Sequence, residues 1–183
     1  MMTQAGSVPL RTRSLAYLLA FALVLPACAT QQRPSAQTPL SDRPTVTSMV
    51  LSVSDGDTLS AIVNGIPEKI RLTWIDCPES DQPFGKEATH MTKQLALKKA
   101  VKVTEFGRDK YHRLLGEVVL PDGRMLNREL VRYGFCWWYR KYAPADIVLE
   151  KLEKDAREAR LGLWADPKPV PPWEWRKRSP PRP

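Results

Sequence analysis

The sequence contains few of the residues from which zinc sites are built. Histidine occurs only twice, at His90 and His112, and the three cysteines lack the close paired spacing of zinc ligands. The chain also has no internal repeats and no glycine-rich phosphate-binding loop. These absences argue against a zinc centre, a repeat architecture and a P-loop nucleotide site.

The longest apolar run, from Leu15 to Leu25, is shorter than the ~20 residues that a membrane-spanning helix needs. Arg11 and Arg13 precede it and "PACAT" follows it, which is the pattern of a secretory signal peptide. Two cleavage sites fit. "LPAC" resembles a lipoprotein box, which predicts a lipid anchor on Cys28, and "ACA" alternatively predicts a cut after residue 29. Both predict a protein exported to the cell envelope or secreted.

The amino-acid composition predicts that the chain consists of four segments. Residues 1–27 form the signal peptide and residues 28–45 a polar, proline-containing disordered tether. Residues 46–166 form one globular domain, and residues 167–183 form an irregular, proline-rich basic tail whose tryptophans pack back onto the domain. We expect a monomer.

The chain is basic, with a formal net charge of +8. Removal of residues 1–27 takes away two arginines and no acids, so 26 cations and 20 anions remain and the charge becomes +6. A basic protein suits a polyanionic partner such as nucleic acid or a membrane surface, and an ordinary basic surface is the alternative. Cys77 and Cys136 are predicted to form a disulfide in an oxidising compartment, with two buried thiols as the alternative.

The hydrophobic pattern predicts an α+β domain. Strands are expected at 46–53, 58–63, 68–75, 101–106 and 114–120, and "NG" at 64–65 indicates a tight hairpin. About three helices are expected, at 84–95, 125–134 and 144–162; in the last, residues 148, 152, 156 and 159 share a face. This order suits a five-stranded OB-fold β-barrel, since a sandwich needs about seven strands.

Three carboxylates are predicted at one rim of this barrel. Asp57 ends the first hairpin turn, and Asp76 and Glu79 flank the end of the third strand. Carboxylate and carbonyl oxygens are the ligands that Ca²⁺ prefers, so Asp57, Asp76 and the backbone carbonyl of Cys77 form a candidate calcium site. Alternatively, the aspartates of "DGD" only favour the turn.

Two arginines favour a phosphate ligand at the same rim. Arg71 lies on the same side of its strand as Thr73 and Ile75, and Arg113 precedes the fifth strand. The planar guanidinium pairs with phosphate oxygens through two hydrogen bonds. Paired arginines and a cation therefore suit phosphodiester cleavage, whereas a salt bridge from Arg71 to Asp76 is the structural alternative.

The motifs "SDGDT", "IRLTWIDCPE", "DKYHR" and "MLNRELVRYG" occur in the order, and near the spacing, of the thermonuclease or staphylococcal nuclease family. The resemblance covers about residues 48–165. It implies a calcium-dependent nuclease on an OB-fold barrel that cleaves DNA and RNA and leaves 3′-phosphates. By this resemblance the metal ligands are Asp57 and Asp76, the catalytic residues Arg71, Glu79 and Arg113, and the substrate-binding residues Lys110, Tyr111 and Tyr142.

The chain departs from the family pattern at a few positions. His112 replaces a glycine before the second arginine, Cys77 replaces a threonine, and Arg140 replaces a nucleotide-side tyrosine. Trp137, Trp138 and the following tyrosine are expected either to stack on bases or to belong to the core. The predicted function is an exported endonuclease; a silent nucleic-acid-binding barrel and a structural envelope lipoprotein remain as alternatives.

Overall fold

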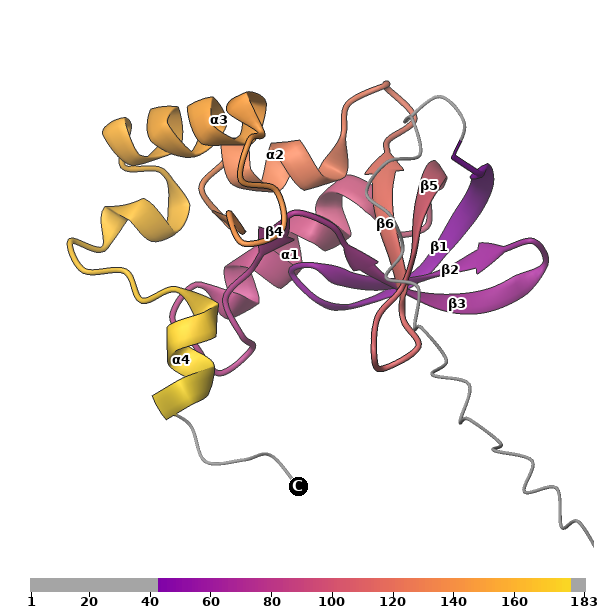
Figure 1. The fold of residues 1–183 in the computed structure, drawn as a ribbon, viewed down its shortest axis with the longest axis horizontal. Helices are drawn as coiled ribbons and strands as arrows, with labels where there is room; N and C mark the ends of the chain where they lie inside the picture. The colour runs from indigo at the N-terminus through magenta and orange to yellow at the C-terminus, as the bar shows by residue number, and fades with distance from the viewer. Residues whose placement is uncertain (1–42, 179–183) are drawn as a thin grey trace, which may run out of the picture. The chain divides into compact units, whose positions relative to one another are not determined.

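The computed structural model describes residues 43–178, so the predictions for the signal peptide and for the lipid anchor on Cys28 lie outside the described residues. Five strands form a closed antiparallel barrel with one parallel pair (Figure 1). Around the barrel they follow the order β1 (Thr45–Asp55), β2 (Thr58–Val63), β3 (Ile66–Leu72), β6 (Leu114–Val119) and β5 (Ala100–Arg108). The predicted five-stranded α+β barrel is confirmed.

The "NG" hairpin forms as expected. Asn64 and Gly65 have φ angles of 51° and 81°, in the left-handed region that a two-residue turn of this kind requires. Val63 pairs with Ile66 across the turn, so β2 and β3 stay in register up to the hairpin tip. This register fixes which side chains of β3 reach the opposite end, where Arg71 lies beside Thr58.

The third predicted strand is longer than the observed one. β3 ends at Leu72, the chain turns at Trp74, whose φ is 67°, and a separate short strand β4 (Ile75–Asp76) pairs with β7 (Trp137–Trp138). Asn127 holds this bend, because its Nδ2 donates a hydrogen bond to the carbonyl of Thr73 at 3.0 Å. The bend carries Asp76 out of the barrel wall.

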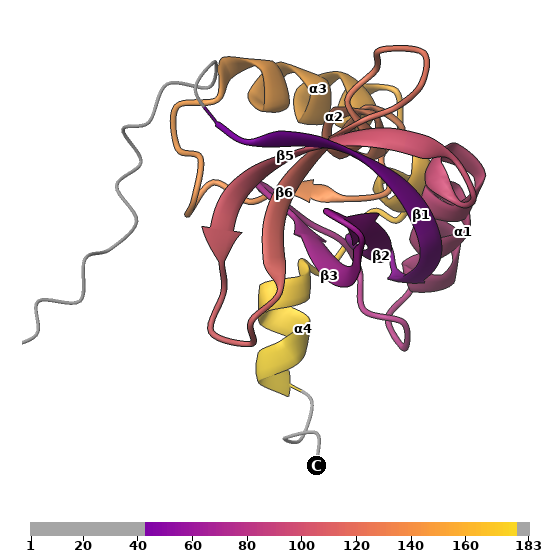
Figure 2. The ribbon, with the colours of Figure 1, turned by 90° about the vertical axis from the view of Figure 1, so that its right-hand side faces the viewer.

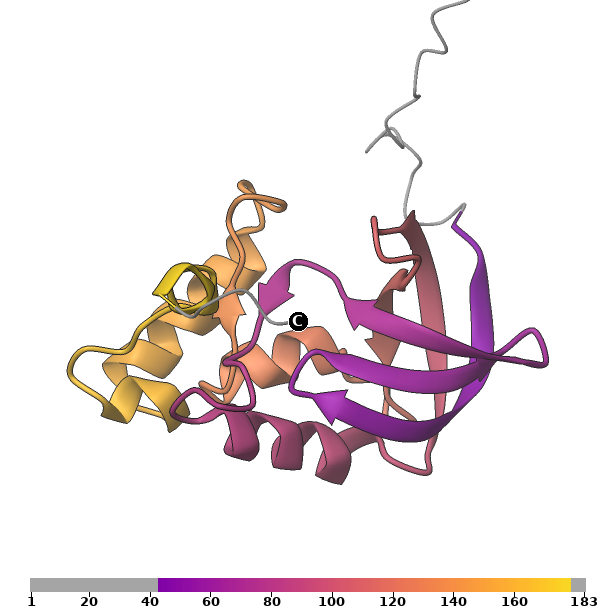
Figure 3. The same ribbon diagram turned by 90° about the horizontal axis from the view of Figure 1, so that it is seen from below.

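The three predicted helices are present as α1 (Gly85–Ala96), α2 (Leu126–Arg132) and α3 (Ile147–Glu158). α1 runs beside β1 (Figure 3). α3 starts later than predicted because the side chain of Asp146 caps it, accepting from the backbone N–H groups of Val148 and Leu149. Its buried residues are Leu149, Leu152, Glu153 and Ala156, so Val148, predicted on the buried face, is exposed.

The C-terminal tail was predicted to be irregular and instead contains a fourth helix. After a 3₁₀ turn at Gly162–Ala165, the chain forms α4 (Pro172–Arg178). Proline suits the first position of a helix, and Trp173 packs beside a small apolar cluster that includes Trp137 and Trp164. In Figure 2, α2 and α3 lie at the top of the view and α4 at the bottom.

The main core fills the barrel and the space between it and α1, α2 and α3. Its fully buried side chains include Leu59, Ile70, Leu72, Ile75, Leu126, Leu130 and Leu149. Within residues 43–178, no helix has the length and apolar character needed to cross a membrane.

Candidate active site

Arg71 joins the two predicted metal-ligand carboxylates. Its Nη2 lies 2.8 Å from Oδ1 of Asp76 and 3.1 Å from Oδ2 of Asp57. Its Nη1 donates to the carbonyls of Leu72 and Ile75, at 2.5 and 3.0 Å. The guanidinium is therefore fixed by four protein oxygens at the point where the chain leaves the barrel.

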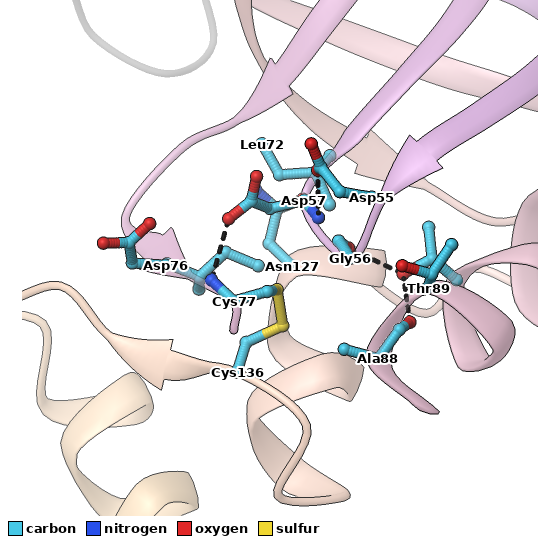
Figure 4. The surroundings of a disulfide bond; sticks show 12 residues. Asp55, Gly56, Asp57, Leu72, Asp76, Cys77, Ala88, Thr89, Asn127 and Cys136 are labelled. Atoms are coloured by element: carbon cyan, nitrogen blue, oxygen red, sulfur yellow. Dashed lines mark hydrogen bonds between the residues drawn. A yellow bond between two sulfur atoms is a disulfide. The ribbon is translucent and has the colours of Figure 1, made fainter. Parts of the chain in front are cut away.

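Asp57 is held by hydrogen bonds with the turn before it, with β3 and with the segment that follows β4 (Figure 4). Its N–H donates to Oδ1 of Asp55 at 3.2 Å, and its carbonyl accepts from the N–H of Leu72 at 2.8 Å. The N–H of Cys77 donates to Oδ2 of Asp57 at 2.8 Å. The turn thus does more than reverse the chain, because it places a carboxylate against the backbone of the β4 segment.

A disulfide joins Cys77, the residue after Asp76, to Cys136 close to both carboxylates (Figure 4). The predicted bridge is confirmed. Gly56 packs against it so closely that a Cβ atom there would lie 2.7 Å from Cβ of Cys77 and 2.9 Å from Cβ of Ala88. The glycine of "DGD" is therefore required by this close approach.

Burial dominates the electrostatics of the aspartates. It raises the pKa of Asp57 to about 6, against the opposing charge of Arg71. Burial likewise raises the pKa of Asp76, and a hydrogen bond from Arg176 opposes this. The positive charges of Arg71 and Arg176 thus favour the ionised forms that burial disfavours.

Glu79 lies in a tight loop between β4 and α1. Its N–H donates to Oε1 of Gln82 at 3.2 Å, and its carbonyl accepts from the N–H of Gln82 at 2.9 Å. A Cβ atom at Gly85 would come within 1.8 Å of the carbonyl oxygen of Glu79, so only glycine fits there. The side chain accepts a hydrogen bond from Arg176 at 2.8 Å.

Arg113 is held by Asp109. Its Nε and Nη2 both lie 2.7 Å from Oδ2 of Asp109, whose Oδ1 accepts from the N–H groups of Tyr111 and Arg113. β3 and β6 pair in parallel with Arg71 opposite Leu115. Because side chains alternate along a strand, extending this register by one pair places Arg113 on the face that carries Arg71.

The predicted substrate-binding side chains are exposed. Tyr111 is 66% and Tyr142 59% exposed, and Nζ of Lys110 lies 4.9 Å from the centre of the Tyr111 ring. Trp137 and Trp138, in contrast, are buried, so these two belong to the core and do not offer faces for base stacking.

The donor chemistry of the site fits a hard cation, with a sparse shell. Asp57 and Asp76 supply carboxylate oxygens, the kind of ligand that Ca²⁺ binds. Over the described part of the chain, no three or more His, Cys, Asp or Glu side chains gather as a metal site. The backbone carbonyl of Cys77, water and substrate oxygens would have to complete the coordination.

Sequence reasoning missed three residues that shape this site. Asp109 orients Arg113, Gln82 braces Glu79, and Arg176 of α4 contacts both Asp76 and Glu79. The aspartate at the start of "DKYHR" is a turn signal that points to its role. Nothing in the proline-rich tail indicates which acid Arg176 would meet.

Residues 69–166 match the family model described as staphylococcal nuclease homologue. The chain is similar to an uncharacterized endonuclease of Escherichia coli, with 46% identity over 130 residues that span 71% of this chain and 84% of the relative. It is also similar to a micrococcal nuclease of Shigella flexneri, with 40% identity over 71% of this chain and 80% of the relative. An uncharacterized endonuclease of Haemophilus influenzae is 37% identical over 73% of this chain and 74% of its own length.

Proposed function

This chain belongs to the staphylococcal nuclease homologue family, and from that premise we propose that it is an exported, calcium-dependent endonuclease that cleaves both DNA and RNA. The chain is a phosphodiester-hydrolysing nuclease, as the family and the nuclease names of its relatives support. Calcium, the absence of sugar specificity and export are the proposed refinements.

One observation carries the proposal. Arg71 holds Asp57 and Asp76 together on the edge of the barrel, with Glu79 three residues further along the chain. Two buried carboxylates whose pKa values are raised by burial are costly for a fold, and a site that binds cations and phosphates explains their presence. A catalytically inactive nucleic-acid-binding barrel would tolerate the loss of some of these groups. In this chain, every charged group that the family resemblance requires is present.

Asp57, Asp76 and the backbone carbonyl of Cys77 would hold the calcium ion. When bound, the ion supplies positive charge next to a phosphate oxygen and so favours attack at phosphorus. Zinc is not expected, because the chain offers no histidine or thiolate in this cluster.

The side chains carry out the remaining chemistry. Glu79 accepts a proton from water as the water oxygen bonds to phosphorus. Arg71 and Arg113 donate hydrogen bonds to the equatorial oxygens, whose negative charge grows in the five-coordinate transition state. The bond from phosphorus to the 5′-oxygen then breaks, the leaving oxygen takes up a proton from solvent water, and the 3′-phosphate stays on the other fragment.

Exposed groups on the β5–β6 loop and near β7 would guide the strand. Lys110 and Tyr111 would contact a phosphate of the substrate and Tyr142 a nucleotide, and the exposure of both tyrosines supports these roles. These groups recognise charge and flat surfaces rather than a particular sugar, which is why we include both DNA and RNA.

Export is supported by the Cys77–Cys136 disulfide, since disulfides persist in oxidising compartments. The lipoprotein-type sequence ending at Cys28 extends this proposal to a membrane anchor for an otherwise monomeric enzyme. Mass spectrometry of the protein purified from cells decides between a lipid-modified Cys28 and an N-terminus at Thr30.

The decisive experiment measures cleavage of plasmid DNA and of single-stranded RNA with added calcium or with chelator, using protein shown to be metal-free. We expect cleavage of both substrates only with calcium, and 3′-phosphate ends that a phosphatase removes. Asp57→Asn should abolish cleavage, whereas Glu87→Gln, an exposed carboxylate of α1, should not change it. Full cleavage in chelator contradicts the calcium proposal, and no cleavage under any condition supports a silent binding module.

A further inference from the structure

α4 brings a positive charge into contact with the carboxylates of Asp76 and Glu79. Nη2 of Arg176 lies 2.6 Å from Oδ2 of Asp76, and its Nη1 lies 3.3 Å from Oδ1 of the same carboxylate. The same Nη1 lies 2.8 Å from Oε1 of Glu79. One guanidinium thus binds a predicted metal ligand and the predicted catalytic base at once, from about one hundred positions later in the sequence.

α4 is held at the site by the residue Val170, which precedes it, and by Trp173 in its first turn. Nε2 of Gln82 donates to the carbonyl of Val170 at 2.5 Å, while Oε1 of the same side chain braces the N–H of Glu79. Trp173 stacks on Tyr139, with ring centres 5.1 Å apart and planes within 4°. The tail is therefore attached to the loop that carries Glu79 and to the segment that follows β7.

The hydrogen bonds that Asp76 accepts hinder the binding of a cation to its carboxylate. Oδ1 accepts from Arg71 and Arg176, and Oδ2 accepts from Arg176. A calcium ion would have to approach the same oxygens to within about 2.3–2.6 Å, next to a fixed positive charge. The guanidinium of Arg176 and the ion compete for the lone pairs of the Asp76 carboxylate oxygens. The positive charge of the guanidinium also repels the ion.

The ion pair between Arg176 and Asp76 can also be broken readily. The side chain of Asp76 is 2% exposed, whereas that of Arg176 is 43% exposed and lies in the last turn of a seven-residue helix. Lys177 and Arg178, which complete that turn, are exposed. A helix of seven residues has little stability of its own, so its last turn can detach while Trp173 stays packed.

We propose that Arg176 is an internal competitor for the metal ion, and that α4 closes the active site until calcium displaces its guanidinium. This inference rests on the proposed calcium dependence, and it assigns to the tail a role that the family match, which ends at residue 166, does not cover. Nucleic acid reinforces the release, because its phosphates attract the freed arginine.

The test is a calorimetric calcium titration of the purified, oxidised protein and of matched variants. Arg176→Gln should bind calcium about tenfold more tightly than the unmodified protein. Arg176→Lys retains the positive charge and should fall between the two. Arg178→Gln, which removes an exposed charge from the same helix, should stay within about twofold of the unmodified protein.

Hydrogen exchange provides a second readout. Calcium should accelerate amide exchange in residues 176–178, the last turn of α4, severalfold in the unmodified protein. In Arg176→Gln, the amides of this turn should exchange fast with or without calcium.

Equal calcium affinity for the unmodified protein and Arg176→Gln overturns the competition and leaves the proposed function intact. Weaker binding by Arg176→Gln also overturns it, since Arg176 would then assist the ion. If neither protein binds calcium and cleavage persists in chelator, the calcium dependence fails and the competition fails with it.

Discussion

The backbone N–H of Cys77 donates a hydrogen bond to Oδ2 of Asp57, 2.8 Å away and twenty positions earlier in the chain. The same cysteine forms the disulfide to Cys136. A predicted metal ligand is therefore held by a backbone group that the disulfide fixes in place. This links the redox state of the protein to the geometry of its site.

Reduction of the disulfide should lower both stability and activity. Closing a loop of this length stabilises the folded state by ~4 kcal/mol in the chain-entropy model, and less if the bridge is strained. Urea unfolding with and without reductant, monitored by circular dichroism, measures the difference. Cys28→Ser should remain fully sensitive to reductant, whereas Cys136→Ser should be insensitive and as unstable as the reduced protein.

The sequence predicted the barrel because its strands alternate in polarity and are punctuated by turn residues such as Asn64 and Gly65. It also predicted which residues gather, since Arg71, Asp57 and Asp76 are in direct contact. Their catalytic and metal-binding roles stay predictions until cleavage is measured.

Tertiary contacts decided the features that the sequence did not reveal. The third strand breaks at Trp74, a residue of high β-propensity, because Asn127 and the edge-to-face contact with Phe106 hold the bend. α4 is too short to be stable alone and depends on the packing of Trp173 against Tyr139. Local patterns contain no information about either contact.

Gly85→Ala should reduce activity about 10²-fold, the scale expected when a catalytic group moves by about 1 Å. The added Cβ would collide with the carbonyl of Glu79, so the loop that carries this carboxylate must shift. Initial cleavage rates measure the effect, and Lys86→Ala, at the next and exposed position of α1, is the control. Equal rates for the two variants would show that the loop adapts without moving Glu79.

His112→Gly should stabilise the protein by up to about 1 kcal/mol. His112 has a φ of 62°, a left-handed conformation that costs residues with a Cβ roughly 1–2 kcal/mol, and glycine loses part of this gain through the greater flexibility of its unfolded chain. His112→Ala removes the same imidazole but keeps the strain, so it should bring no gain. The midpoints of urea unfolding at equal slope compare the three proteins.

Glu117→Gln should make stability less dependent on pH. Burial raises the pKa of Glu117, which is 8% exposed, and Arg128 opposes this only in part. The folded protein therefore favours the protonated carboxyl, and this stabilisation is complete below the unfolded pKa and lost as pH rises through the folded pKa. The variant should be more stable than the unmodified protein at pH 8 and equal to it at pH 4. A constant difference between the two curves would contradict the prediction.

Arg113→Lys should lower kcat by about 10²-fold or more and leave KM nearly unchanged. Asp109 holds Arg113 through two hydrogen bonds, so its guanidinium is oriented before substrate arrives. If it contacts a phosphate oxygen that gains charge only as water attacks, its loss affects the transition state and not the bound ground state. Lysine keeps the charge but not the planar fork that this geometry uses.

The measurement is initial rate against DNA concentration at saturating calcium, with folding checked by circular dichroism. Arg108→Lys is the matched control, because Arg108 ends β5 directly before the same loop and pairs with Glu68 rather than with Asp57 or Asp76. A near-normal kcat with a raised KM for Arg113→Lys would make Arg113 a docking residue. Stabilisation of the transition state would then rest on Arg71, whose four contacts to protein oxygens must be partly exchanged for the phosphate.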